Sequence, residues 1–136
     1  MSASKVIKLM KEKEVDYVDL RFTDPRGKLQ HLTMDGKMVD EEMLNEGVFF
    51  DGSSIAGWKA INESDMILKP DLDRQVIDPF TSHSTLILFC DILDAVKKNP
   101  YERDPRSIAK KAEAYLKKTG IGDKAYFGPE AEFFVF

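Results

Sequence analysis

The sequence predicts an α+β fold in which helices pack against a mixed β-sheet. Two segments of alternating apolar and polar residues flank a turn with proline and glycine at 24–27, which is typical of a β-hairpin. A nearly continuous apolar run over 85–93 predicts a central strand with both faces covered. Apolar stripes at helical spacing, with capping residues, occur at the N-terminus and again after residue 104.

The composition is that of a globular protein and excludes several function classes. The chain has 136 residues, 43% of them hydrophobic and 32% charged, with a formal net charge of −4. This charge gives no electrostatic case for a nucleic-acid partner. Apolar runs fall short of the ~20 residues that span a bilayer, and the N-terminus lacks a hydrophobic signal core, so we expect a cytoplasmic protein without a membrane partner. The single cysteine, Cys90, is predicted to be buried in a strand.

The N-terminal region predicts a helix followed by the hairpin. A helix capped by Ser4 and ending near Glu14 would be amphipathic. Segments 15–22 and 28–34 are the predicted hairpin strands. The apolar stripe of the helix consists of Val6, Ile7, Leu9 and Met10.

A second helix is predicted over 38–46, where Gly47 takes the C-cap role and Val39, Met43 and Leu44 face inward. The next stretch, 49–58, combines two glycines, two serines, one acid and the only tryptophan of the chain. We expect a loop here with exposed aromatic surface and many backbone donors.

Two interpretations of this loop remain open from composition alone. Loops of this kind often carry function. Alternatively, 51–53 is merely a turn and Trp58 merely anchors the core.

The segments that follow predict further strands and a helix. Short strands are expected over 64–69 and 74–79, separated by a turn at 70–73. A polar connector over 96–104 is the best candidate for a domain boundary, after which Asp104 and Pro105 open a helix that runs to Thr119 before Gly120 ends it. The apolar stripe of this helix consists of Ile108, Ala109, Ala112, Tyr115 and Leu116.

This order of elements suggests two structural units. In residues 1–103 a mixed sheet would half-wrap a helix, which is the plan of a ubiquitin-like β-grasp domain. Residues 104–136 would supply the first helix and strand of a second α+β domain. The two histidines, His31 and His83, have no partner at metal-ligand spacing, and we interpret both as structural or surface residues.

Two carboxylates lie two residues apart in the apolar C-terminal stretch 126–135. In an extended strand Glu130 and Glu132 would point to the same side, where like charges need solvent, a basic partner or a cation. A hard divalent cation such as Mg²⁺ or Mn²⁺ prefers such oxygen ligands. Taken alone, the pattern favours a solvated polar face over a metal site.

Four stretches together resemble a known family. They are Phe50-Asp-Gly-Ser-Ser-Ile-Ala-Gly-Trp58, Ile61-Asn-Glu-Ser-Asp-Met66, Asp78-Pro-Phe80 and Phe127-Gly-Pro-Glu-Ala-Glu-Phe-Phe134. In this order and at these separations the chain resembles the N-terminal part of bacterial type I glutamine synthetase. The resemblance covers the whole chain but only the first part of a full-length enzyme of that family.

The resemblance implies a fold, an activity and site residues. It implies a β-grasp domain followed by the start of a catalytic domain with a two-metal site at a subunit interface. Glu130 and Glu132 would each bind one of two Mg²⁺ or Mn²⁺ ions. Asp51 would reach a neighbouring subunit's site, bind ammonium and help remove its proton, with Trp58 close by. The implied assembly is a dodecamer of two rings, and the implied substrates are glutamate, ammonium and ATP.

The implied chemistry is ATP-dependent amidation of glutamate through a γ-glutamyl phosphate. A carboxylate near the acyl phosphate would hold ammonium and favour loss of its proton, while water is excluded. We expect the chain as given to be inactive, because the nucleotide site and the other metal ligands of the family lie past Phe136. Two alternatives remain: a ligase that joins glutamate to another amine, and a non-catalytic β-grasp interaction module.

Overall fold

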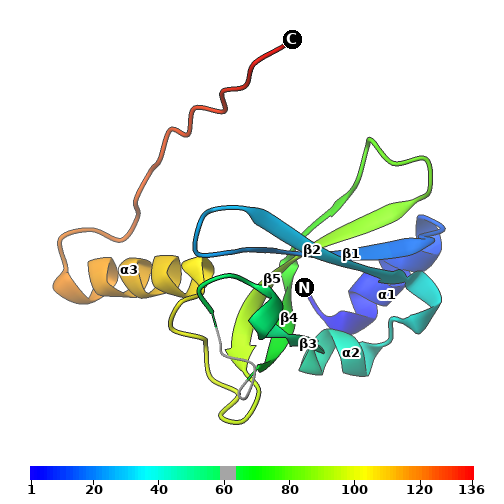
Figure 1. Ribbon diagram of the computed structural model, residues 1–136, viewed down its shortest axis with the longest axis horizontal. Helices are drawn as coiled ribbons and strands as arrows, with labels where there is room; N and C mark the ends of the chain where they lie inside the picture. Colours follow the sequence, from blue (N-terminus) through cyan, green and yellow to red (C-terminus); the bar gives the residue numbers. More distant parts are fainter. Residues whose placement is uncertain (59–63) are drawn as a thin grey trace.

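The computed structural model (Figure 1) describes residues 1–58 and 64–136. Its centre is a five-stranded sheet in the order β2-β1-β5-β4-β3. Strands β1 and β5 are parallel, and the other neighbouring pairs are antiparallel, so the sheet is mixed as predicted. The elements, in which η marks a short 3-10 helix, are α1 (Ala3–Glu12), β1 (Tyr17–Thr23), β2 (Leu29–Asp35), η1 (Gly36–Met38), α2 (Glu41–Glu46), β3 (Val48–Asp51), η2 (Gly52–Ser54), β4 (Asp65–Ile77), β5 (Thr85–Asp94) and α3 (Pro105–Thr119).

Strand β5 holds the central position that its apolar run predicts. It pairs with β1 on one side and β4 on the other, so its backbone groups are satisfied in both directions. Cys90 on β5 is fully buried as predicted, and burial raises the pKa of its thiol. The core joins one face of the sheet to α1 and α2, and its fully buried aliphatic side chains include Val6, Val18, Leu20, Leu44, Leu86 and Leu88.

The N-terminal helix and the hairpin follow the sequence pattern closely. Helix α1 begins at Ala3 with Ser2 as its N-cap, so the predicted cap at Ser4 is wrong by two positions. Its apolar stripe does face the core. In the hairpin turn, Oδ1 of Asp24 accepts hydrogen bonds of 2.9 Å from the backbone N–H groups of Arg26 and Lys28. An aspartate that bonds its own turn in this way fixes the register of the two strands.

The second helix is shorter than predicted. Asp40 caps α2 by accepting a hydrogen bond from the N–H of Met43, and residues 36–38 form the separate turn η1. Gly47 ends α2 with a φ of 88°, as its C-cap role requires.

Two predicted boundaries in the second half of the sheet are wrong. Residues 65–77 form one long strand, β4, and the predicted turn at 70–73 is instead an irregularity between Pro70 and Gln75. Proline lacks the N–H that a regular ladder needs, which accounts for a shift in pairing at this point. The predicted loop 49–58 is also wrong in part, because residues 48–51 form β3 on the edge of the sheet.

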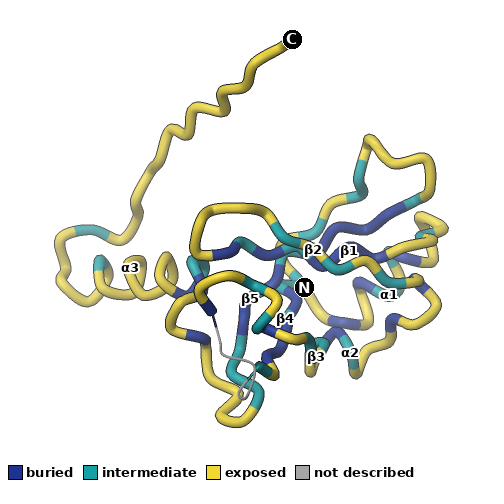
Figure 2. The backbone as a smooth tube through the Cα atoms, in the orientation of Figure 1, coloured by how far each residue is buried: buried dark blue, intermediate teal, exposed yellow. Residues whose placement is uncertain are grey.

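Helix α3 has the predicted boundaries, but the strand predicted after it is not formed. Asp104 caps α3 and Gly120 ends it in the left-handed region. Residues 121–136 contain no helix or strand and extend away from the sheet (Figure 1), and most of them are exposed (Figure 2). A strand needs a neighbour to bond its backbone, and this segment has none within the described part of the chain.

Both histidines are exposed and contact neighbouring side chains. Nδ1 of His31 lies 2.8 Å from Oδ1 of Asp19, and His83 packs edge-on against Tyr17, which agrees with structural or surface roles.

Among the described residues, none of the helices combines the length and apolar character needed to cross a bilayer.

Candidate functional site

Asp51 lies at the junction of β3 and η2, where its carboxylate is exposed. Its Oδ1 accepts a hydrogen bond of 2.6 Å from Oγ of Ser53 and one of 2.8 Å from the Ser53 backbone N–H. These bonds, with a smaller contribution from the Ser64 side chain, hold the pKa of Asp51 below its ordinary value. The carboxylate is therefore ionised near neutral pH and open to a cation from outside.

The turn that carries Asp51 is fixed against β4. The backbone N–H of Gly52 donates to the carbonyl of Ser64 at 2.7 Å. Gly52 is buried, and a Cβ at this position would lie 2.3 Å from Sδ of Met66. Glycine allows the close approach that closes the turn, so the position of Asp51 depends on it.

Trp58 lies in the core and not on an exposed loop surface. Its side chain is 5% exposed, and its ring lies 5.6 Å from that of Phe22, 6.1 Å from Phe50 and 5.9 Å from Tyr101 between centroids. The expectation of exposed aromatic surface on this loop therefore fails at Trp58, although Phe49 is 65% exposed. The interpretation as a core anchor fits this geometry, because the indole supports the loop from behind.

The end of the loop is held by residues that follow β5. The hydroxyl of Tyr101 donates to the carbonyl of Trp58 at 3.1 Å. Nη1 of Arg103 donates to the carbonyl of Gly57 at 3.0 Å and to that of Trp58 at 3.3 Å. These contacts join positions 43 to 46 residues apart, so no local sequence signal could reveal them.

Glu130 and Glu132 lie on the exposed segment after α3. The structure does not bring them together with Asp51: segment 121–136 leads away from the sheet of which β3 forms one edge (Figure 1). Their oxygens are donors that Mg²⁺ and Mn²⁺ prefer. In the described residues, however, no group of three or more acidic, histidine or cysteine side chains is placed to hold a metal ion. The described residues thus contain no complete set of metal ligands.

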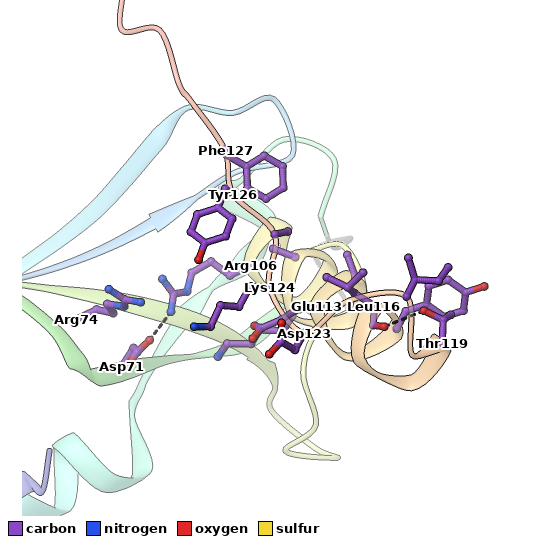
Figure 3. Close-up of a pocket in the computed structure, with 16 residues that line it drawn as sticks. Asp71, Arg74, Arg106, Glu113, Leu116, Thr119, Asp123, Lys124, Tyr126 and Phe127 are labelled. Carbon is purple, nitrogen blue, oxygen red and sulfur yellow. Dashed lines mark hydrogen bonds and ion pairs between the residues drawn. The ribbon is translucent and has the colours of Figure 1, made fainter.

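A cavity of about 850 Å³ lies between α3 and the segment that follows it (Figure 3). Lys124 and Tyr126 lie along this segment on one side of the cavity, and Arg106 of α3 pairs there with Asp71 of β4 at 2.6 Å. The residues that line it do not include Asp51, Trp58 or the two glutamates. The cavity is therefore separate from these four candidate site residues.

Sequence reasoning missed the residues that hold Asp51 and its loop. Ser53 could have been found, because a serine two positions after an aspartate at a turn is a recognised hydrogen-bonding pattern. Tyr101 and Arg103 could not, because they belong to a polar connector that carries no motif of its own. Residues 61–63 of the second motif lie outside the described residues.

Comparison with known proteins relates this geometry to a family. A model of the glutamine synthetase β-grasp domain matches residues 14–95, and one of the glutamine synthetase catalytic domain matches residues 102–136. The chain is 64% identical over 135 residues to glutamine synthetase of Rhizobium meliloti (strain 1021) and 58% identical over 136 residues to that of Escherichia coli (strain K12). These matches cover 99% and 100% of this chain.

The chain spans 29% of the length of either relative. A cryo-EM structure of Plasmodium falciparum glutamine synthetase superposes with a TM-score of 0.79 at 24% identity, over 88% of this chain and 23% of that one. This likeness agrees with the fold described above and confirms the predicted α+β class with a β-grasp domain. The chain therefore belongs to the glutamine synthetase family, and it corresponds to the N-terminal region of these enzymes.

Proposed function

We propose that this chain is the N-terminal part of a glutamate–ammonia ligase that uses ATP to amidate glutamate through a γ-glutamyl phosphate. The observation that carries the proposal is the match of nearly the whole chain to glutamine synthetases at about 60% identity. In this proposal residues 1–103 are the β-grasp domain and residues 104–136 begin the catalytic domain.

Asp51 is proposed to bind the ammonium substrate. An exposed carboxylate that stays ionised attracts a small cation. The hydrogen bonds from Ser53 lower the pKa of Asp51 and so keep its carboxylate ionised. Ammonium is not a nucleophile until it loses a proton, so Asp51 would hold the cation beside the acyl phosphate and accept its proton as a general base, which leaves ammonia at the point of attack. Trp58 would support the loop that carries Asp51 from the core side, and its burial agrees with this role.

Glu130 and Glu132 are proposed ligands of Mg²⁺ or Mn²⁺. Divalent ions in such a site neutralise phosphate charge and orient the transferred group. The two carboxylates would need further ligands from the rest of the full-length protein, since the described part of this chain gathers no third one beside them. A strand over 126–135 would then form only when the rest of the sheet supplies a neighbour.

The proposed assembly is a cytoplasmic dodecamer of two rings, with Asp51 serving a neighbouring subunit. Asp51 is exposed at the end of the edge strand β3, and segment 121–136 leads away from the sheet (Figure 1), which supports a site shared between copies. Oligomer formation would then be a condition of catalysis, because one copy alone does not bring Asp51 and the two glutamates together.

The proposal is tested in the full-length protein with Asp51→Ala. We expect the KM for ammonium to rise steeply or kcat to fall, while the KM for ATP is unchanged, measured as glutamine formation with each substrate varied in turn. Equal losses for ammonium and ATP would contradict the role of Asp51. Amidation of glutamate with methylamine in place of ammonium would favour the alternative of another amine acceptor, and absence of any ATP-dependent amidation would favour the interaction module.

A further inference from the structure

The carbonyl groups at the end of the 51–58 loop are bound by two side chains from the connector between β5 and α3. Trp58 accepts from the hydroxyl of Tyr101 at 3.1 Å, and Arg103 reaches both Gly57 at 3.0 Å and Trp58 at 3.3 Å. Three hydrogen bonds thus converge on two adjacent carbonyls. A loop end held in this way has little freedom to move relative to the connector.

Contacts lead from this point back to both neighbours of Asp51. The N–H of Trp58 donates to the carbonyl of Ile55 at 3.2 Å, and the N–H of Ile55 donates to the carbonyl of Gly52 at 3.1 Å. The ring of Trp58 also packs edge-on against that of Phe50 at 6.1 Å. A shift of Trp58 would therefore be passed to the residues on either side of Asp51.

The connector is itself fixed to the central strand and to α3. Tyr101 is 8% exposed, and its N–H donates to the carbonyl of Ile92 at 2.8 Å. The fully buried carboxylate of Asp104 accepts from the N–H of Ile92 at 3.3 Å and from Oγ of Ser107 at 2.9 Å. The donors that hold the loop therefore belong to a rigid part of the fold.

We propose that Tyr101 and Arg103 are positioning residues for Asp51. They hold the 51–58 loop so that the Asp51 carboxylate is presented at a fixed place to the site that it serves. This inference rests on the proposed role of Asp51 in ammonium binding. A charge offered to a partner site is effective only when it is placed accurately, because small misplacements of a binding group reduce rates strongly.

The test uses the full-length protein with Tyr101→Phe, Arg103→Ala and the double variant. Tyr101→Phe keeps the ring that packs on Trp58 and removes only the hydroxyl. The KM for ammonium should rise about three- to tenfold in the double variant, as expected for the loss of a few partly exposed hydrogen bonds. The KM for ATP should stay within about twofold. Arg103→Lys, which keeps a donor, should recover part of the ammonium affinity that Arg103→Ala loses.

Tyr17→Phe is the matched control, because Tyr17 on β1 is 39% exposed and lies against His83, away from the loop. It should leave the KM for ammonium unchanged. An ammonium KM in the double variant equal to that of Tyr17→Phe would overturn the inference. So would parallel rises in the KM for ammonium and for ATP with a lower melting temperature, which would indicate a general structural role.

Asp51→Asn, measured in parallel, separates this inference from the proposed function. If Asp51→Asn raises the ammonium KM and the double variant does not, the positioning inference alone is wrong. If Asp51→Asn leaves the ammonium KM unchanged, the proposed role of Asp51 is wrong, and the positioning inference is overturned with it.

Discussion

Oγ of Ser53 donates a hydrogen bond of 2.6 Å to Oδ1 of Asp51, the same oxygen that accepts the backbone N–H of Ser53. Ser53 therefore holds one oxygen of the carboxylate by two contacts. Because the backbone bond does not depend on the side chain, the serine hydroxyl can be removed without abolishing the turn.

Ser53→Ala in the full-length protein should lower kcat/KM for ammonium by about two- to tenfold, the range expected for one hydrogen bond to a charged group at an exposed site. The carboxylate stays ionised near neutral pH, so the expected effect is on orientation and not on charge. Steady-state kinetics with ammonium varied measure it. Ser53→Thr should restore most of the loss, and Ser4→Ala on α1 is the control that should change nothing. Full activity of Ser53→Ala would show that the hydroxyl is dispensable.

Asp19 on β1 should make stability depend on pH. Its side chain is 6% exposed, and it accepts from Nε of Arg21 at 2.7 Å and from the Thr33 hydroxyl at 2.8 Å. Burial raises the pKa of Asp19, but the bonds from Arg21, His31 and Thr33 together outweigh it and hold the pKa below its ordinary value. A lowered folded-state pKa stabilises the fold above the unfolded-state value, and this stability is lost as pH falls through the folded-state value.

Asp19→Asn should therefore lower the free energy of unfolding by about 1–3 kcal/mol near pH 7, because a charge-assisted hydrogen bond is lost. The difference from the unsubstituted chain should narrow as pH falls below the unfolded-state pKa of about 4 and on through the lower folded-state pKa, where the native carboxylate becomes protonated. Urea unfolding across this pH range measures both effects. Asp123→Asn, at an exposed position after α3, is the control. A deficit that stays constant with pH would mean that packing, and not ionisation, is responsible.

Gly47 should tolerate no side chain. Its φ is +88°, and a Cβ would lie 2.5 Å from the carbonyl oxygen of Leu68 and 2.6 Å from Cγ2 of Ile67. Gly47→Ala should cost about 2–4 kcal/mol, because backbone strain and a clash with a neighbouring strand add together.

Gly27 offers a matched comparison, because its φ is +84° but a Cβ placed there would have no atom within 4 Å. Gly27→Ala should therefore show the strain alone, about 1–2 kcal/mol. Urea unfolding of both variants gives the two costs. Equal losses of unfolding free energy in the two variants would show that the structure around Gly47 relaxes enough to remove the clash with Leu68.

Glu130→Ala and Glu132→Ala in the full-length protein should each reduce Mn²⁺ affinity by at least about tenfold, since even indirect ligand partners contribute that much. Isothermal titration calorimetry measures the change, with Glu102→Ala in the exposed connector as the control. The 136-residue chain alone should bind Mn²⁺ far more weakly, because its described residues place no third ligand nearby. Unchanged affinity in both variants would contradict the metal assignment.

Local signals in the sequence predicted much of the fold. The Asp-Pro-Arg-Gly turn located the hairpin, the Asp104 cap and Gly120 located α3, and the apolar run over 85–93 located the central strand. Each of these features depends on residues that are close in the chain, or on burial so complete that composition alone reveals it.

The family motifs likewise depend on the sequence alone, and the family comparisons confirm the resemblance. The specific roles of Asp51, Trp58, Glu130 and Glu132 stay predictions.

Tertiary structure decided the features that depend on partners far away in the chain. It merged 65–77 into one strand, made residues 48–51 an edge strand, buried Trp58 and placed Tyr101 and Arg103 on the loop end. It also left 126–135 without a strand. A β-strand and a buried indole are stabilised by neighbours that the local sequence does not specify, so their state follows from which distant segments are present to pair and pack with them.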